Sequence, residues 1–264
     1  MLIDFHTHCF PDKIAKTAME KLSDASGGLM NNTDGTVSGL KNLMSEQNVD
    51  VSVVLNIATN AHQQSRVNDF AASINSIEGI VSFGSVYPKS EDAFDELERI
   101  KSLGLKGIKL HPDYQGFQVD DPDLRPLYKK ISALGFITVF HAGVDFGFAP
   151  PYGATPKKLL TALKWFDSPV VAAHWGGLSY NQEVLDLLCA TPIYLDTSFG
   201  YSHIPKYYAK AILEKHGADK ILFGTDCPWQ TSEMEMRLLR SLSLSQNEFE
   251  KITCLNAKKL LNLK

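Results

Sequence analysis

The feature that most constrains the fold of this chain is the alternation of eight short apolar runs with longer segments of helical period. The short runs are rich in β-branched residues, which is typical of strands buried in a parallel sheet. Between them, residues 91–103 and 123–134 carry apolar side chains at helical spacing. The predicted strands are residues 2–8, 51–57, 80–86, 105–111, 137–143, 170–176, 193–198 and 220–226.

Eight strand and helix units in 264 residues match the size and order of a (β/α)₈ barrel, the TIM barrel. No linker rich in proline, glycine and serine divides them, so we expect a single α/β domain over residues 1–264. Residues 23–39 show no periodicity and are predicted to form a loop beside the barrel mouth. An open, doubly wound sheet is the other fold considered. No GxGxxG motif follows a predicted strand, so that fold lacks its usual nucleotide-binding support.

Two histidines lie close together in the first predicted strand, within the stretch DFHTH. Alternate side chains of a strand share a face, so we expect Asp4, His6 and His8 to project to one side. A buried imidazole costs free energy unless its ring nitrogens find partners. A cation that accepts a lone pair from each ring would satisfy both histidines. Backbone carbonyl groups are the alternative partners.

Most of the histidines fall at the carboxyl ends of predicted strands, where the loops of a barrel build the active site. Five of the eight histidines do so, together with one aspartate: His6, His8, His111, His141, His174 and Asp226. Catalytic zinc sites combine imidazole nitrogens with a carboxylate and leave one position for water. We predict that the metal ligands are His6, His8, His141 and Asp226.

A metal at this position would act on a bound water molecule. It lowers the pKa of that water from about 15.7 to about 7, so that hydroxide is available at neutral pH. His174 lies one strand further round than His141 and is predicted to donate a proton to this water or accept one from it. We therefore predict His174 and Asp226 as the catalytic residues. Zinc is the expected metal because most ligands are nitrogens, and manganese or cobalt would suit the same site.

Several motifs in the chain resemble those of the amidohydrolase superfamily. They are DFHTH at 4–8, GIKLHP at 107–112, FHAG at 140–143, AAHWGG at 172–177, FGTDCPW at 223–229 and NAKKLL at 256–261. More narrowly, they resemble the metal-dependent branch that contains aminocarboxymuconate semialdehyde decarboxylase and related hydrolases. The resemblance spans nearly the whole chain and implies the same barrel. It also implies the same four ligands, with His174 orienting or activating the water.

Two reactions are compatible with this ligand set. The first is hydrolysis of an ester, lactone or amide-like bond of a small molecule by metal-activated water. The alternative is metal-dependent decarboxylation of an unsaturated or aromatic carboxylic acid. A non-catalytic binding module would require the ring of polar residues to be incomplete, and none of them is missing. We therefore expect an enzyme, with hydrolysis as the leading hypothesis.

Four further residues are candidate substrate contacts. Some superfamily members bridge two metals with a carbamylated lysine at the fourth strand, where Lys109 stands, but we interpret Lys109 as a structural or substrate-binding residue. Its neighbour His111 shares its strand face, and the sequence does not decide which of the two approaches the metal. Arg66 is a candidate for binding a substrate carboxylate, and Trp175 for shaping the pocket. Asp196, in YLDTS, is interpreted as structural.

The composition limits the partners and the location of the protein. The formal net charge of −4 provides no basic surface for nucleic acid. No apolar span of about 18 residues is present, and the first residues do not resemble a secretion signal, so no membrane partner is expected. The four cysteines are scattered without a CxxC pair, which is typical of a reducing compartment. We expect a cytoplasmic protein with a small-molecule substrate and a homodimer as a possible assembly.

Overall fold

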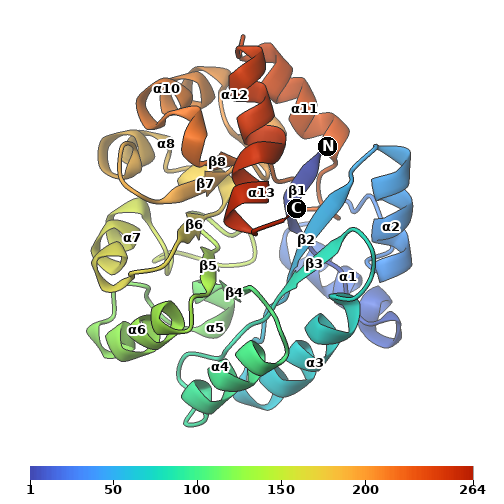
Figure 1. The fold of residues 1–264 in the computed structure, drawn as a ribbon, viewed down its shortest axis with the longest axis vertical. Helices are drawn as coiled ribbons and strands as arrows, with labels where there is room; N and C mark the ends of the chain where they lie inside the picture. Colours follow the sequence, from blue (N-terminus) through green and yellow to red (C-terminus); the bar gives the residue numbers. More distant parts are fainter. Residues whose placement is uncertain (264) are drawn as a thin grey trace.

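The structure, a computed structural model, describes residues 1–263 and contains a ring of eight parallel strands surrounded by helices (Figure 1). The predicted (β/α)₈ barrel is confirmed. Each strand lies within its predicted range but is shorter. The strands are β1 (Ile3–Thr7), β2 (Val51–Leu55), β3 (Ile80–Phe83), β4 (Gly107–Leu110), β5 (Ile137–Phe140), β6 (Val170–Ala172), β7 (Tyr194–Asp196) and β8 (Ile221–Leu222). The residues at the carboxyl end of each predicted range already belong to the following loop, and β1, β4, β7 and β8 also begin one or two residues later than predicted.

Backbone hydrogen bonds close the ring at its two seams. Strands β1 to β3 pair in one sheet and β4 to β8 in another. Between β3 and β4, Gly84 donates its N–H to the carbonyl of Gly107 at 2.9 Å and accepts from the N–H of Lys109 at 2.8 Å. Between β1 and β8, the N–H of Phe5 donates to the carbonyl of Phe223 at 2.7 Å. The two sheets therefore form one barrel without a free edge.

The helices follow the strands in the order expected for this fold. The predicted helices at 91–103 and 123–134 correspond to α4 and α6, and each is followed by a glycine with left-handed φ, Gly104 at 76° and Gly135 at 74°. The predicted loop at 23–39 is shorter than expected, since α1 and α2 extend into it from both sides. The helices are α1 (Asp12–Ala25), α2 (Val37–Glu46), α3 (Gln64–Ile74), α4 (Ala93–Ser102), α5 (Pro112–Gln115), α6 (Arg125–Ala133), α7 (Pro156–Ala162), α8 (Asn181–Glu183), α9 (Gly200–His203), α10 (Lys206–His216), α11 (Ser232–Ser241), α12 (Gln246–Glu250) and α13 (Asn256–Leu260).

An apolar cluster fills the interior of the barrel on the side away from the carboxyl ends of the strands. Its strand members come from around the ring: Ile3, Phe5, Val53, Leu55, Phe83, Ile137, Val139, Val171 and Leu222. Gly107 leaves room for one of them, because a Cβ there would lie 2.2 Å from the ring of Phe83. Helix α13 crosses the middle of the ring in Figure 1, and Ala257 and Leu261 pack against this cluster. This packed layer supports the polar residues at the other end of the strands.

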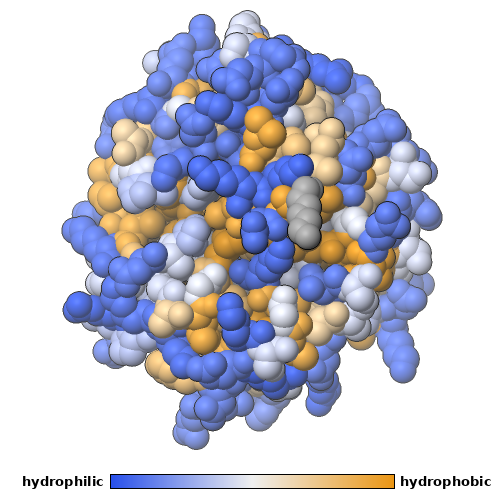
Figure 2. Space-filling view, in the orientation of Figure 1, coloured by the Kyte–Doolittle hydropathy of each residue, from blue (hydrophilic) through white to orange (hydrophobic). Residues whose placement is uncertain are grey.

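The outside of the molecule carries hydrophilic side chains over much of the face drawn in Figure 2, with apolar ones between them. Among residues 1–263, none of the helices has both the length and the apolar character needed to cross a bilayer.

Candidate metal centre

A β-bulge in β1 directs His6 and His8 into the barrel. Between Asp4 and Thr7, β1 contains one residue more than the stretch of β2 with which it pairs. An extra residue reverses the two-residue alternation of a strand. Phe5 therefore points into the inner apolar cluster before the bulge, whereas His6 and His8 share the interior face after it.

The prediction that Asp4 shares a face with His6 and His8 is wrong, because the bulge lies between them. Asp4 instead ties β1 to the loop that follows β8. Its Oδ1 accepts from the backbone N–H groups of His6 at 3.2 Å and Thr225 at 3.0 Å, and its Oδ2 accepts from the Thr225 hydroxyl at 2.7 Å. Burial raises the pKa of Asp4 to about 7, although these hydrogen bonds act in the opposite direction.

Three of the four predicted metal ligands converge at the mouth of the barrel. The Nε2 atom of His8 lies 3.1 Å, and that of His6 3.3 Å, from Oδ1 of Asp226. On the other side of each ring, Nδ1 of His8 lies 2.8 Å from the carbonyl of Leu55, and Nδ1 of His6 lies 2.8 Å from Oδ2 of Asp196. Carbonyl and carboxylate oxygens only accept, so both Nδ1 atoms carry protons. In the neutral rings, both Nε2 atoms present lone pairs.

This arrangement fits a divalent metal ion. Two imidazole lone pairs and a carboxylate oxygen repel one another unless a cation lies between them. The ligand atoms of His6, His8 and Asp226 all lie within 4.8 Å of one another, which one ion can span. The carbonyl and carboxylate that hold each Nδ1 are the partners that orient metal-binding histidines in proteins.

His141, the fourth predicted ligand, lies against the predicted catalytic residue His174. Its Nδ1 is 3.0 Å from Nε2 of His174, and its Nε2 is 3.3 Å from the carbonyl of Val144, so Nε2 carries the proton and Nδ1 a lone pair. Burial is the main cause that lowers the pKa values of His6, His141 and His174 well below 6.5. The three rings are therefore neutral at pH 7, as metal ligands and general bases must be.

The backbone is strained where two of these residues leave their strands. His174 has φ of 57° and Asp226 has φ of 69°, both in the left-handed region that residues other than glycine rarely adopt. Such strain is found most often at functional sites, where the surrounding structure holds it in place. It directs both side chains toward the same space at the barrel mouth.

His111 belongs to a second group, which the sequence did not reveal as a group. Its Nε2 lies 3.1 Å from Oδ2 of Asp145, and its ring stacks on that of His141 with centroids 4.1 Å apart. Its Nδ1 accepts from the backbone N–H of Tyr114 at 3.5 Å, so Nε2 carries the proton and donates it to Asp145. Asp145 was not predicted, and the only signal for it is its position in the loop that follows the fifth strand.

Lys109 points into the barrel beside His6, His8 and Asp226, which we call the first group. Its Nζ lies 3.3 Å from Nε2 of His6, and only 1% of the residue is exposed. Burial lowers its pKa to about 8, while the charges of Asp196, Asp226 and Asp145 oppose this shift. Both side chains therefore lie beside predicted metal ligands, Lys109 beside His6 and His111 against His141 and Asp145.

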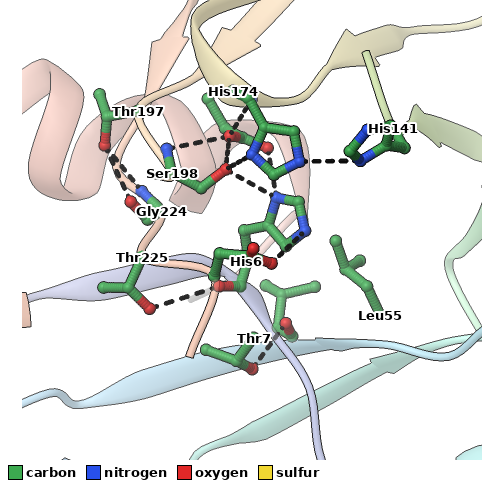
Figure 3. Close-up of polar contacts among 12 residues, drawn as sticks. His6, Thr7, Leu55, His141, His174, Thr197, Ser198, Gly224 and Thr225 are labelled. Atoms are coloured by element: carbon green, nitrogen blue, oxygen red, sulfur yellow. Dashed lines mark hydrogen bonds and ion pairs between the residues drawn. The ribbon is translucent and has the colours of Figure 1, made fainter. Parts of the chain in front are cut away.

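Asp196 and Ser198 form a buried pair behind the histidines. Sequence reasoning gave Asp196 a structural role and missed Ser198. In Figure 3, Ser198 lies between the rings of His6 and His174, with its Oγ 3.1 Å and 2.8 Å from their Nδ1 atoms. Asp196 holds His6 through Nδ1 and His174 through its backbone N–H at 3.0 Å. The motif YLDTS at the end of β7 is the signal that could have indicated both residues.

The structure does not bring Arg66 and Trp175 together with these residues. Arg66 is exposed on α3, and none of the hydrogen bonds found within residues 1–263 joins it to the site. Trp175 is buried in the apolar core between the barrel and its helices, and its ring N–H donates to the carbonyl of Thr197 at 3.0 Å. Its ring is therefore used for packing and for holding the loop that precedes Ser198.

The geometry can now be compared with known proteins. A family model described as amidohydrolase matches residues 3–263. The chain belongs to the amidohydrolase family. The resemblance inferred from the motifs is confirmed, and this amidohydrolase is an enzyme, as predicted. No curated protein sequence matches it.

Solved structures similar to this amidohydrolase share its fold at low sequence identity. An uncharacterized TIM-barrel protein from Bordetella bronchiseptica is 19% identical with a TM-score of 0.80, over 99% of this chain and 98% of the other. A 2,6-dihydroxybenzoate decarboxylase in complex with 2,6-dihydroxybenzoate is 17% identical with a TM-score of 0.75, over 99% of both chains. A dihydroxybenzoic acid decarboxylase from Polaromonas, with bound manganese and 2-nitroresorcinol, is 17% identical with a TM-score of 0.73, over 99% and 97%.

Proposed function

We propose that this amidohydrolase is a metal-dependent decarboxylase of an aromatic or unsaturated carboxylic acid. The observation that carries the proposal is the convergence of the His6, His8 and Asp226 ligand atoms beside the buried ammonium group of Lys109. The likeness to decarboxylases of dihydroxybenzoic acids supports it and favours this reaction over hydrolysis, the reaction first expected from the sequence.

The reaction replaces a carboxylate on carbon with a proton and releases carbon dioxide. When bound, the metal would act as a Lewis acid that holds substrate oxygens and disperses their negative charge. His6, His8, His141 and Asp226 are the residues proposed to hold it. Lys109 can pair with the substrate carboxylate, because an ammonium group buried this deeply needs a negative partner. The new proton would reach the carbon through His174 or Asp226, which both lie beside His6.

Hydrolysis of an ester, lactone or amide is the second candidate. The neutral ring of His174 favours it, because water must lose a proton to a base as it attacks an acyl carbon. The same ligands would serve both reactions, so only substrates can separate them.

The test is a substrate screen of the metal-loaded protein. Hydroxybenzoic acids, with 2,6-dihydroxybenzoate included, are assayed for carbon dioxide release, and esters, lactones and amides for hydrolysis. We expect carbon dioxide and the decarboxylated product in equal amounts from at least one acid, with activity lost in Asp226→Ala and retained in Arg66→Ala. Hydrolysis of an ester or lactone without carbon dioxide release from any acid would replace the proposal by the second candidate.

Zinc remains our first proposal for the metal, with manganese next because a similar structure binds it. We further propose a small-molecule substrate, a cytoplasmic location and, where a second chain is involved, a homodimer. Elemental analysis and light scattering of the purified protein test the metal and the assembly.

A further inference from the structure

Most of the predicted site residues are buried, although they lie at the mouth of the barrel, where a substrate must arrive. The exposed fractions are 1% for His6, 7% for His141, 4% for His174 and 8% for Asp226. A substrate therefore reaches these side chains only when part of the mouth moves aside, as the loops over many active sites do. The loops differ in how firmly they are held, and this difference indicates which part moves.

Residues 145–148 form a turn over the site, in the loop that follows β5. At the base of the turn, Nε2 of His141 donates to the carbonyl of Val144 at 3.3 Å. The first residue of the turn, Asp145, accepts from Nε2 of His111 at 3.1 Å. Both histidine rings are buried, whereas the turn carries exposed side chains. The turn therefore lies between these rings and the solvent.

The ring of Phe146 covers the His174 side of the site. Its centroid lies 6.2 Å from that of Phe199 and 5.2 Å from that of His203. Phe199 meets His174 edge to face at 6.1 Å and is only 4% exposed, whereas Phe146 is 44% exposed. Phe199 also has a left-handed φ of 62°, which a bulky residue keeps only where the surrounding structure holds it. Phe199 is thus the fixed inner ring, and Phe146 is the outer ring that rests on it.

The ring of Phe148 covers the other side of the site in the same way. It meets Tyr114 edge to face at 4.8 Å, and Tyr114 meets His111 edge to face at 4.7 Å. Phe148 is 36% exposed, so it is again the outer ring. One short turn therefore contributes the outer members of two aromatic stacks, which reach from the surface down to His174 and to His111.

The backbone of this turn is not fastened to the other loops of the mouth. Among the hydrogen bonds found in the part of the chain that the structure describes, its N–H groups bond only within the turn. Gly147 donates to Oδ1 of Asp145 at 2.7 Å, and Phe148 donates to the Asp145 carbonyl at 3.1 Å. A neighbouring segment is held more firmly, since both the backbone N–H and the side-chain amide of Asn32 donate to the carbonyl of Pro228, at 2.7 Å and 3.2 Å. Segments with few backbone hydrogen bonds to their surroundings open most easily.

We propose that the turn at 145–148 is the gate through which ligands enter the site, and that the hydrogen bond between Asp145 and His111 keeps it closed. The structure holds the closed form. In the open form the turn moves about its base, where the backbone N–H of Val144 donates to the carbonyl of Leu178 at 3.0 Å, and the inner aromatic rings line the entrance. The gate goes beyond the proposed function, holds for either reaction, and gives the His111–Asp145 pair a task that neither reaction requires.

The test measures access to His174 in the zinc-loaded protein, without any substrate. Diethyl pyrocarbonate modifies unprotonated histidine rings that it can reach, and peptide mass spectrometry follows each histidine separately. In Phe146→Ala we expect His174 to be modified roughly 3- to 10-fold faster than in the wild type, because losing the ring contacts of the closed form raises the population of the open form. His62 is exposed and serves as the internal reference, whose rate should be equal in all proteins.

Phe94→Ala is the matched control, because Phe94 is also 44% exposed but lies on α4, outside both aromatic stacks. Its His174 rate should equal that of the wild type. Asp145→Ala removes the closing hydrogen bond, leaves both phenylalanine rings in place, and should also raise the His174 rate. If Phe146→Ala does not fold, Phe146→Leu also removes the aromatic contacts.

Two results would overturn the gate. One is a His174 rate that stays at the wild-type value in the Phe146 and Asp145 variants. The other is an equal increase in Phe94→Ala, which would mean that loss of any partly exposed ring loosens the whole fold. Faster modification in Phe146→Ala but not in Asp145→Ala would overturn the role given to the hydrogen bond with His111.

Discussion

The two histidine groups at the barrel mouth contain the same kinds of residues but differ in where their protons lie. In the first, Nδ1 of His8 faces the carbonyl of Leu55 and carries the proton, so Nε2 directs a lone pair at Asp226. In the second, Nδ1 of His111 faces a backbone N–H, so its inner nitrogen carries a proton that satisfies Asp145.

This difference shows that the partner on the far side of an imidazole decides what its near side can bind. A hydrogen-bond acceptor beside Nδ1 fixes the proton there, so Nε2 carries a lone pair and needs a cation to separate it from a facing carboxylate. A hydrogen-bond donor beside Nδ1 leaves the ring proton on Nε2, and a carboxylate accepts that proton's hydrogen bond without a metal. The first group is therefore the candidate metal site, and the second is a hydrogen-bonded pair beside it.

The largest effect expected from this comparison is on metal content. Asp226→Ala removes the carboxylate of the first group, so we expect metal to fall from about one ion per chain to less than about a tenth. His6→Ala should do the same. His111→Gln alters only the second group and should retain the metal. Elemental analysis of the purified variants measures this, and full metal content in Asp226→Ala and His6→Ala would exclude the first group as the site.

Removing the metal from the wild type should destabilise the fold by a smaller amount. A ligand that binds only the folded state stabilises it by about 2.7 kcal/mol when its concentration is a hundredfold above its dissociation constant. A chelator should therefore lower the midpoint of thermal unfolding of the wild type and of His111→Gln. The midpoint of Asp226→Ala should not respond, and an equal shift in all three proteins would mean that the metal binds elsewhere.

The third effect concerns the charge of Asp145 in the second group. Burial alone would raise its pKa, but the hydrogen bond from His111 and the electrostatic interactions with His141 and His111 lower it to about 2. The unfolded chain then binds the proton first as the pH falls, so this carboxylate stabilises the fold above about pH 4 and loses that effect toward pH 2. Asp145→Asn should cost about 1–3 kcal/mol at pH 7.

Urea unfolding of Asp145→Asn and the wild type, at several pH values, measures this contribution. The difference in unfolding free energy should shrink as the pH falls below about 4, while the metal content at pH 7 stays equal in the two proteins. A difference that is constant with pH would show that the charge of Asp145 is not involved.

The smallest effect is expected outside both groups. Arg66 is exposed on α3, and substitutions at such positions usually change the unfolding free energy by less than about 0.5 kcal/mol. Arg66→Ala should therefore match the wild type in stability, metal content and activity. A selective loss of substrate affinity would restore the carboxylate-binding role that the sequence suggested.

Much of the architecture could be predicted from the sequence because it depends on local periodicity. The alternation of apolar runs and helical segments indicated the strands and the helices at 91–103 and 123–134. Because strand ends meet at one face of a barrel, the placement of His6, His8, His174 and Asp226 at that face also followed from their positions along the chain.

Other features were decided only by the tertiary structure. The bulge in β1 is set by pairing with β2, and it moved Asp4 away from the histidines that follow it. Trp175 follows a strand like the site residues, but a left-handed backbone places it in the core. The roles of Ser198 and Asp145 depend on which ring nitrogen lies beside them. Periodicity along one chain segment reports which face a side chain occupies, whereas proton positions depend on atoms brought together from strands far apart in the sequence.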